Sequence, residues 1–164
     1  MPAFNAYMGK FSGWMQEGET HSDVAVYIPH EDGLMKGAYP PERQRVWVWG
    51  EYELRYIFPP KEVEGYHPLW INRHFLEQAT YTKGKLSVGD ASFSTLYVDV
   101  DYMDVRALKR LVELAKQGLS VCLKRNPKEP GKVKSGEYAD LLNQLNALDN
   151  VTQNFNKAID HPPL

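Results

Sequence analysis

The sequence has one cysteine, no long apolar run and almost no net charge, and each of these shortages excludes a class of protein. With Cys122 alone, no internal disulfide and no cysteine-based zinc site can form. No apolar run approaches the roughly 20 residues that a membrane-spanning helix needs. The formal net charge of -2 gives no field that would gather nucleic acid or an anionic membrane. We therefore expect neither of them as a partner.

The motifs of several common α/β enzymes are also missing. The sequence contains no GxSxG, no GxGxxG after a strand and no GxxxxGK followed by Ser or Thr. A hydrolase elbow, a dinucleotide site and a phosphate loop therefore lose their main support, while flavin or nucleotide binding at the sheet edge is left open. We expect no cofactor, no metal and no catalytic residue. A carboxylate pair for glycosidic cleavage could be assembled from Glu31, Asp32, Glu51 and Glu53, and such chemistry also requires a set separation between the two carboxyl groups.

Residues 96–125 predict a strand, an amphipathic helix and a second strand. Residues 96–100 are apolar or aromatic apart from Asp99 and include two β-branched valines, and we expect Asp101 to cap the helix that follows. From Val105 the apolar residues recur at three- and four-residue spacing, and residues 120–123 form a second apolar run. Strand, helix and strand within about 30 residues indicate a right-handed parallel crossover.

The length of 164 residues and the hydrophobic content of 43% suit one globular domain. We expect a single α/β domain: a three-layer sandwich with a mainly parallel sheet, flavodoxin-like or class I glutamine amidotransferase-like. Residues 1–18 would be an N-terminal helix, 19–155 the sheet with its covering helices, and 156–164 a tail.

The N-terminal segment carries an aromatic stripe at helical spacing. We expect this helix to pack on the sheet, and the alternative is that it covers a neighbouring domain. The segment lacks the basic and apolar regions of a secretion signal, so we expect none there and assign no compartment. The stripe consists of Phe4, Tyr7, Met8, Phe11, Trp14 and Met15.

Residues 23–29 predict a buried strand of the central sheet. His30, Glu31 and Asp32 follow it directly, at the place where open α/β sheets carry their ligand-binding loops. The two carboxylates suit a metal or sugar hydroxyl groups, and the alternative is that they solvate the loop or cap the next segment. We select these residues as candidates for ligand or domain contact.

Trp70 and Asn72 complete the set of candidate contact residues. They follow Pro68, which disfavours a helix and indicates an ordered turn before a short helix. Trp47 and Trp49 share one face if their segment is a strand, and their rings suit either a core or a platform for sugars.

The rest of the sequence predicts elements that build on the parallel pair. A hairpin is expected across residues 83–85 and a loop over 126–137. A helix over 137–148 and an edge strand at 151–152 would follow. Cys122 lacks the small residues of an amidotransferase nucleophile turn, so we interpret it as structural.

Four stretches carry a resemblance to a known family. On them the chain resembles part of the glycoside hydrolase family 106 proteins, which are large α-L-rhamnosidase-like enzymes. Together they cover most of the length, and as a set they are moderately specific. They read KFSGWMQEGETHSDVAVYIPHED, GYHPLWINRHFL, GKLSVGDASFSTLYVDVDYMD and LAKQGLSVCLKRNPKEPG.

The resemblance implies the amidotransferase-like or flavodoxin-like domain that follows the catalytic (β/α)₈ barrel, excised from a larger protein that is periplasmic or secreted. FSGWMQEGETHSDVAVYIP resembles the last helix of the barrel running into the first strand of this domain. The family's catalytic glutamates are expected on the barrel, so none is carried onto this chain.

The sequence thus suggests a non-catalytic accessory domain of a glycoside hydrolase, which supports the barrel and lends loops to the binding of rhamnose-containing carbohydrate. A free-standing carbohydrate-binding module that uses Trp47, Trp49 or Trp70 is one alternative. An amidotransferase-like enzyme is the other.

Overall fold

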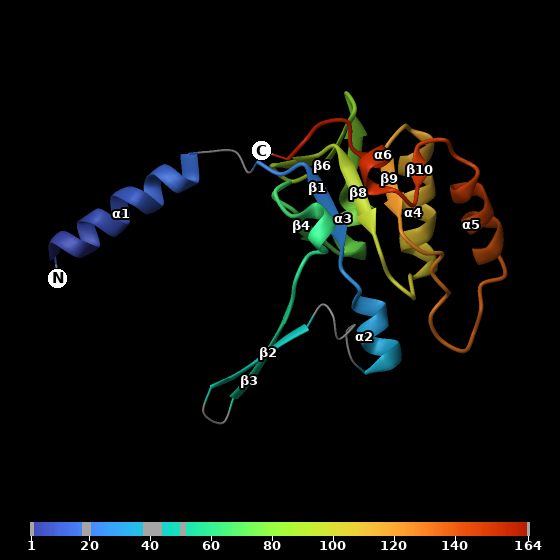
Figure 1. Ribbon diagram of the computed structural model, residues 1–164, viewed down its shortest axis with the longest axis horizontal. Helices are drawn as coiled ribbons and strands as arrows, with labels where there is room; N and C mark the ends of the chain where they lie inside the picture. The colour runs from blue at the N-terminus through green and yellow to red at the C-terminus, as the bar shows by residue number, and fades with distance from the viewer. Residues whose placement is uncertain (1, 18–20, 38–43, 50–51, 164) are drawn as a thin grey trace.

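The computed structural model describes residues 2–17, 21–37, 44–49 and 52–163, and for 44–49 and 52–57 it describes the backbone only. Its centre is a sheet of five parallel strands (Figure 1). These strands are β1 (Val24–Tyr27), β4 (Leu69–Ile71), β8 (Thr95–Val98), β9 (Ser120–Leu123) and β10 (Val151–Thr152).

The spatial order of the strands is β10-β9-β8-β1-β4. Numbered along the chain and read from β4, this is the order 2-1-3-4-5 of flavodoxin-like folds. The chain steps from β1 to β4 on one side and then to β8 on the other, so the order reverses beside β1. The predicted α/β class with a mainly parallel sheet is confirmed.

The predicted strand, helix and strand are present. Helix α4 (Val105–Lys116) joins β8 to β9, and the two strands pair in parallel. The predicted cap is wrong, because Asp101 lies in the preceding loop and pairs with Lys36. Asp104 caps the helix instead and accepts a hydrogen bond from the backbone N–H of Arg106 at 2.8 Å. The buried stripe of α4 comprises Ala107, Leu108, Leu111, Val112, Leu114 and Ala115.

Strand β1 is buried on both faces, as its continuous apolar run predicted. Ala25 and Tyr27 belong to the cluster that contains the stripe of α4. Val24 and Val26 belong to a second cluster on the opposite face. The two-residue period of a strand divides its side chains in this way, and a strand covered on both sides lies at the centre of the sheet.

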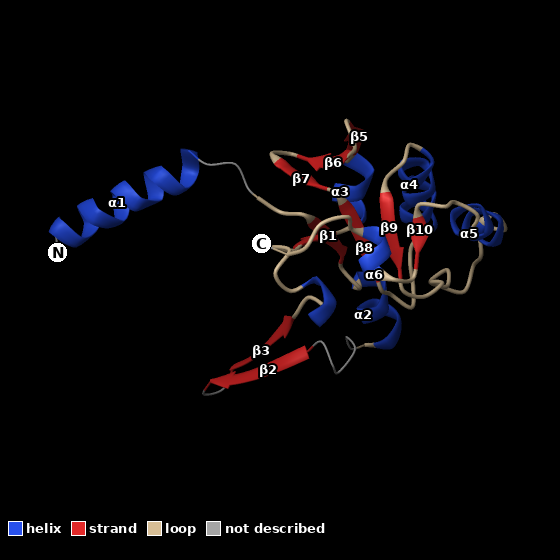
Figure 2. Ribbon diagram, turned by 45° about the horizontal axis from the view of Figure 1, so that its top comes forward, coloured by secondary structure: helices blue, strands red, loops and turns tan. Residues whose placement is uncertain are grey.

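Helices cover both faces of the central sheet, which makes a three-layer sandwich (Figure 2). On one face lie α3 (Arg73–Gln78), α4 and α5 (Tyr138–Asn146), which contribute buried side chains to the larger cluster. The other face carries the 3₁₀-helix η2 (Lys61–Val63) and helix α6 (Phe155–Ala158). Both of these elements on the second face are short.

Two smaller antiparallel sheets extend the fold. The predicted hairpin is the first part of a meander of β5 (Thr80–Thr82), β6 (Lys85–Val88) and β7 (Ala91–Phe93). Strands β2 (Gln44–Trp49) and β3 (Tyr52–Ile57) form a separate hairpin. The backbone at Trp47 and Trp49 is therefore a strand, but their side chains lie outside the described residues.

The C-terminal segment is more ordered than a polar tail. Residues Phe155, Ala158 and Ile159 are buried in the second cluster. The backbone oxygen of Ala158 accepts hydrogen bonds from Thr95 Oγ1 at 2.7 Å and from Ser120 Oγ at 2.6 Å. The short helix α6 is thereby fixed to β8 and β9, which the polar composition of residues 156–164 did not reveal.

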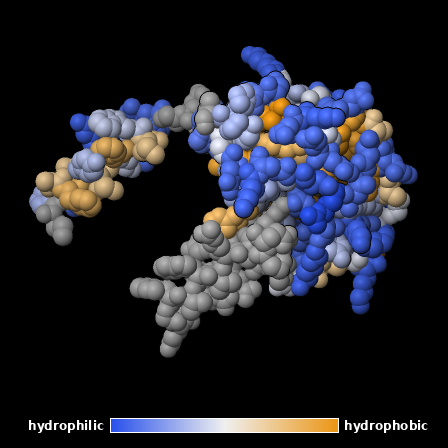
Figure 3. Space-filling model, in the orientation of Figure 1, coloured by the Kyte–Doolittle hydropathy of each residue, from blue (hydrophilic) through white to orange (hydrophobic). Residues whose placement is uncertain are grey.

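Helix α1 (Pro2–Glu17) forms as predicted but has no buried residue. The expected packing on the sheet is therefore wrong. Its ring ladder remains on the surface, with Tyr7 and Phe11 centroids 4.5 Å apart and Phe11 and Trp14 centroids 5.4 Å apart. Figure 1 shows α1 standing away from the sheet, and Figure 3 shows apolar side chains along it. In the described part of the chain, no helix has the length and apolar character to cross a membrane.

The exposure of α1 predicts that its aromatic residues contribute little to stability. We expect Trp14→Ala, at a ring that is 55% exposed, to change the free energy of unfolding by less than about 0.5 kcal/mol. Leu108→Ala, inside the core, should cost about 2 to 5 kcal/mol because it leaves a cavity. Urea denaturation followed by far-UV circular dichroism measures both, and a large loss in Trp14→Ala would show that α1 packs on the body in solution.

Candidate functional site

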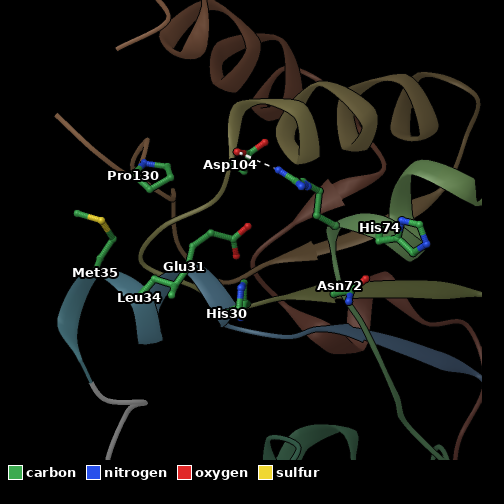
Figure 4. A pocket seen from close by; sticks show the side chains of 9 residues that line it. His30, Glu31, Leu34, Met35, Asn72, His74, Asp104 and Pro130 are labelled. Carbon is green, nitrogen blue, oxygen red and sulfur yellow. Dashed lines mark ion pairs between the residues drawn. The ribbon is translucent and has the colours of Figure 1, made fainter. Parts of the chain in front are cut away.

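A pocket of about 420 Å³ lies at the carboxyl ends of the central strands. Helix α2 (His30–Lys36) follows β1, the start of α3 follows β4, and the loop 99–104 follows β8. Because β1 marks the reversal of strand order, this edge is where flavodoxin-like folds bind ligands. The pocket is lined by His30, Glu31, Leu34, Met35, Asn72, Arg73, His74, Asp104 and Pro130 (Figure 4).

Asp32 holds the two sides of this edge together. Its carboxylate is 1% exposed and accepts hydrogen bonds from the backbone N–H of Asp101 at 3.0 and 2.9 Å and of Tyr102 at 2.6 Å. Charge-assisted bonds of this kind are the stronger ones in proteins. They tie α2 to the loop after β8, so Asp32 is a structural joint.

Glu31 points in a different direction from Asp32. Its Oε1 accepts a hydrogen bond from the hydroxyl of Tyr27 at 3.0 Å, while its Oε2 is buried without a hydrogen-bond partner among the described residues. Burial, and then the negative charge of Glu31, raise the pKa of Tyr27, so this hydroxyl stays protonated and donates. Glu31 therefore keeps one carboxylate oxygen to accept a further hydrogen bond.

Arg73 brings a positive charge to the pocket. Its Nη1 lies 3.4 Å from Asp104 Oδ2, and its Nε lies 3.9 Å from Glu77 Oε1. These ion pairs are longer than good hydrogen bonds, so the guanidinium retains donor capacity. Asn72 caps α3, because its Oδ1 accepts a hydrogen bond from the backbone N–H of Phe75 at 3.0 Å. The site thus combines an acceptor with donors.

A network of ion pairs lies beside the pocket. Lys36 of α2 pairs with Asp101. Arg125 pairs with Asp101 Oδ1 at 3.0 Å and with Asp99 Oδ1 at 2.6 Å. These contacts join the segments that follow β1, β8 and β9. Together with Asp32, they fix the rim of the pocket in position.

The structure brings three of the five predicted contact residues into one pocket: His30, Glu31 and Asn72. Asp32 is buried below the rim. Trp70 lies in the edge strand β4, where it is half-buried and packs against the second cluster. The alternative was that the two carboxylates solvate the loop or cap the next segment. Both are buried in the first turn of α2, and Asp32 accepts its hydrogen bonds from the loop after β8 and not from α2.

Sequence reasoning missed Arg73 and Asp104 as pocket residues. Arg73 directly follows the selected Asn72, and Asp104 precedes the predicted helix at Val105, so cap positions could have indicated both. Tyr138 lies outside this pocket, and its buried hydroxyl has no hydrogen-bond partner within the described ranges. Burial raises the pKa of Tyr138, with smaller contributions from the charges of Glu129, Glu31 and Asp104.

The pocket offers hydrogen-bonding groups, and among the described residues that line it there is no Ser, Thr, Cys or Lys. Across the described residues, no group of three His, Cys, Asp or Glu side chains has a metal-binding arrangement. Cys122 lies inside β9, and burial raises the pKa of its thiol to about 12, with Glu62 adding to the rise and Lys124 opposing it. A thiol of that pKa is a poor nucleophile.

Comparisons with known proteins add no neighbour. No family model, no curated protein and no solved structure matches the chain. The kinship suggested by the four sequence stretches therefore stays a prediction, and the argument for function depends on the fold and the pocket.

The burial and hydrogen bonds of Asp32 predict that replacing it lowers the stability of the fold. We expect Asp32→Ala to lower the free energy of unfolding by about 2 to 4 kcal/mol, because the backbone N–H groups of Asp101 and Tyr102 lose their acceptor. Asp32→Asn, which keeps one acceptor oxygen, should lose less. Asp160→Ala, at an exposed position, is the control and should stay within about 0.5 kcal/mol. Equal urea midpoints for Asp32→Ala and the control would refute the joint.

Asp101 predicts a pH-dependent contribution to stability. The hydrogen bond from Lys36, and after it that from Arg125, hold the pKa of Asp101 below its usual value, although burial opposes them. A carboxyl group with a lowered pKa stabilises the fold above its unfolded value of about 3.9. That contribution is lost as the pH falls through the folded value.

Wild type should therefore exceed Asp101→Asn in stability by about 0.5 to 1 kcal/mol at neutral pH, as expected for a partly exposed pair. Near the unfolded pKa of about 3.9 and below, the difference should shrink. Urea unfolding across this range measures it, and Lys36→Gln should reproduce part of the effect. A difference that does not vary with pH would contradict the assignment.

Proposed function

We propose that this chain is a non-catalytic α/β domain of a glycoside hydrolase of the α-L-rhamnosidase-like kind. It supports a neighbouring catalytic barrel and contributes loops from the carboxyl edge of its sheet to carbohydrate binding. The observation that carries the proposal is α1, a helix with six large apolar side chains exposed and none buried. Exposed apolar surfaces of this size mark contacts with another protein surface.

The position of α1 in the chain supports a barrel as the partner. The stretch that begins at Phe11, in the second half of α1, resembles the end of a catalytic barrel's last helix, and such a helix packs its apolar face against the barrel. Residues Tyr7, Phe11 and Trp14 form one line of ring contacts along α1. Their exposure here follows directly if the surface they cover belongs to another domain.

The central sheet supports the accessory domain and weakens the enzyme alternative. The resemblance implied a flavodoxin-like or amidotransferase-like sheet after the barrel, and the strand order is of this kind. An amidotransferase nucleophile sits on an exposed strand-to-helix turn, whereas Cys122 is buried within β9. The burial of Cys122 therefore supports a structural role for this residue.

The carbohydrate-binding module receives no support from Trp70. A stacking platform presents the face of its ring to solvent, whereas Trp70 packs against the cluster around Tyr66 and Phe155. The hydrogen-bonding groups that suit a sugar are instead gathered at the carboxyl edge, around Glu31 and Arg73. Sugar contact by loops of this edge is the part of the proposal that the pocket supports.

The proposal predicts a division of activity between this chain and a longer product of its reading frame. The 164-residue chain should release no aryl group from p-nitrophenyl α-L-rhamnoside above background. A product extended upstream through the same frame should carry the barrel and hydrolyse it. A chromogenic assay of the two at equal concentration measures this.

Hydrolysis by the 164-residue chain, lost in Glu31→Gln, would overturn the non-catalytic role. An upstream frame that encodes no barrel would overturn the kinship. Glu113→Gln, at an exposed residue of α4, is the matched control, because it makes the same chemical change away from the pocket.

A further inference from the structure

The amino edge of the central sheet, opposite the pocket, holds a buried carboxylate beside two histidines. Asp23 directly precedes β1 and is 7% exposed. Its Oδ2 lies 3.6 Å from Nε2 of His21, and its Oδ1 lies 3.7 Å from Nε2 of His161. Within the described part of the chain, Oδ2 has no hydrogen-bond partner. One carboxylate is thus shared between two histidines that are far apart in sequence.

The main chain at Asp23 is fixed by the strands and loops around it. Its N–H donates a hydrogen bond to the carbonyl oxygen of Tyr66 at 3.2 Å. Its carbonyl oxygen accepts hydrogen bonds from the backbone N–H groups of Ser94 at 2.9 Å and Thr95 at 3.3 Å. The segment 92–95 contains no titratable side chain. A change in the contacts of the carboxylate therefore has to come from the histidine segments.

Residues 159–163 form a strap that lies against the loop before β4. The hydroxyl of Tyr66 donates a hydrogen bond to the backbone oxygen of His161 at 3.2 Å, and the two rings lie 5.9 Å apart. Gly65 has a φ of +88°, and a Cβ there would lie 2.9 Å from Cβ of Pro163. Figure 1 shows the C-terminal segment beside the start of β1. The strap is thereby seated next to Asp23.

Both ring nitrogens of His161 face oxygen atoms that accept hydrogen bonds. Nδ1 lies 3.1 Å from the carbonyl oxygen of Pro162, and Nε2 faces the carboxylate of Asp23. A neutral imidazole carries one N–H, whereas an imidazolium carries two. The neutral ring can donate to only one of these acceptors, and it turns a lone pair toward the other. The protonated ring can donate to both, and its charge attracts Asp23.

His161 is the histidine whose protonation should matter most. The side chain of His21 is 60% exposed, and its ring centroid lies 5.8 Å from that of His67. Two positive charges at that distance would repel each other. The ring next to His161 is instead the phenol of Tyr66. The remaining charged residues of these segments are exposed and, within the described ranges, form no ion pair with this group; they are Glu64, Lys157 and Asp160.

We propose that Asp23 and His161 form a pH-sensitive latch, which holds the strap against the amino edge of the sheet when His161 is protonated. Histidine is the side chain that changes its charge between about pH 5 and 8. The latch closes as the pH falls through this range and loosens as the pH rises. Loosening uncovers the edge of the second cluster, where Tyr66 and Ile159 are each 7% exposed in the closed form. The latch does not depend on the proposed function.

Amide hydrogen exchange at Ile159 measures how firmly the latch is closed. Its backbone N–H donates to the carbonyl oxygen of Phe155 at 3.2 Å, where α6 passes into the strap. Protection factors remove the intrinsic dependence of exchange on pH. We expect the protection of Ile159 to be about two- to fivefold higher at about pH 5.5 than at about pH 7.5, the effect of one partly exposed ion pair. Leu141, in α5 on the other face, is the internal reference and should change less.

Variants at both partners test the pair. Asp23→Asn keeps the size of the side chain and removes its charge, and His161→Gln removes the group that gains a proton. Each should abolish the dependence of Ile159 protection on pH. Asp140→Asn, at an exposed residue of α5, makes the same chemical change away from the latch and should keep the wild-type difference. His21→Gln should keep most of it.

The latch is overturned if the protection of Ile159, relative to Leu141, is the same at both pH values. It is also overturned if the difference survives in Asp23→Asn or in His161→Gln. Loss of the difference in Asp140→Asn would trace it to the overall charge, and loss in His21→Gln would overturn the assignment to His161. Because His161 is only partly buried, His161→Gln tests the latch even if Asp23→Asn does not fold.

Discussion

The carboxyl edge of the sheet depends on one buried carboxylate. Asp32 lies in the first turn of α2, the helix after β1. It accepts hydrogen bonds from the backbone N–H groups of Asp101 and Tyr102, in the loop after β8. From β1 the chain continues to β4 at one edge of the sheet, whereas from β8 it continues to β9 on the other side. Without a bridge, α2 and the loop would be joined only by surface ion pairs, which contribute little. Asp32 therefore fixes α2 against the loop after β8, and both of these segments line the pocket.

The sequence was sufficient for the elements whose side chains repeat with one clear period. The stripe of α4, the continuous apolar run of β1 and the parallel pair of β8 and β9 were all predicted. Strand β4 was read as a turn, since three residues are too few to show a period and Leu69 faces solvent as an edge residue. Helix α6 was read as a tail, because its stability comes from bonds to Ala158 by Thr95 and Ser120, far away in sequence.

The candidate site was predictable in position but not in the role of each residue. The end of a buried parallel strand indicated where His30, Glu31 and Asp32 lie. Either Glu31 or Asp32 could have accepted hydrogen bonds from the loop after β8. The rotation of the short helix α2 decides between them, and the sequence does not specify that rotation. Arg73 and Asp104 are 31 positions apart in numbering yet form an ion pair, a contact that requires the strand order to be known.

Glu31 and Asp32 are neighbours in sequence, but their carboxylates lie in different hydrogen-bonding environments. Asp32 is buried, and the backbone N–H groups of Asp101 and Tyr102 offset the cost of removing its charge from water. Glu31 is buried, and one of its oxygens has no hydrogen-bond partner among the residues that the structure describes. A residue needed only for packing would be more favourable there without a charge. Tyr27 orients Glu31 through a single hydrogen bond but leaves the second oxygen to the pocket. Packing alone therefore does not explain why a carboxylate stands at position 31, whereas the hydrogen bonds to the loop after β8 do explain the carboxylate at position 32.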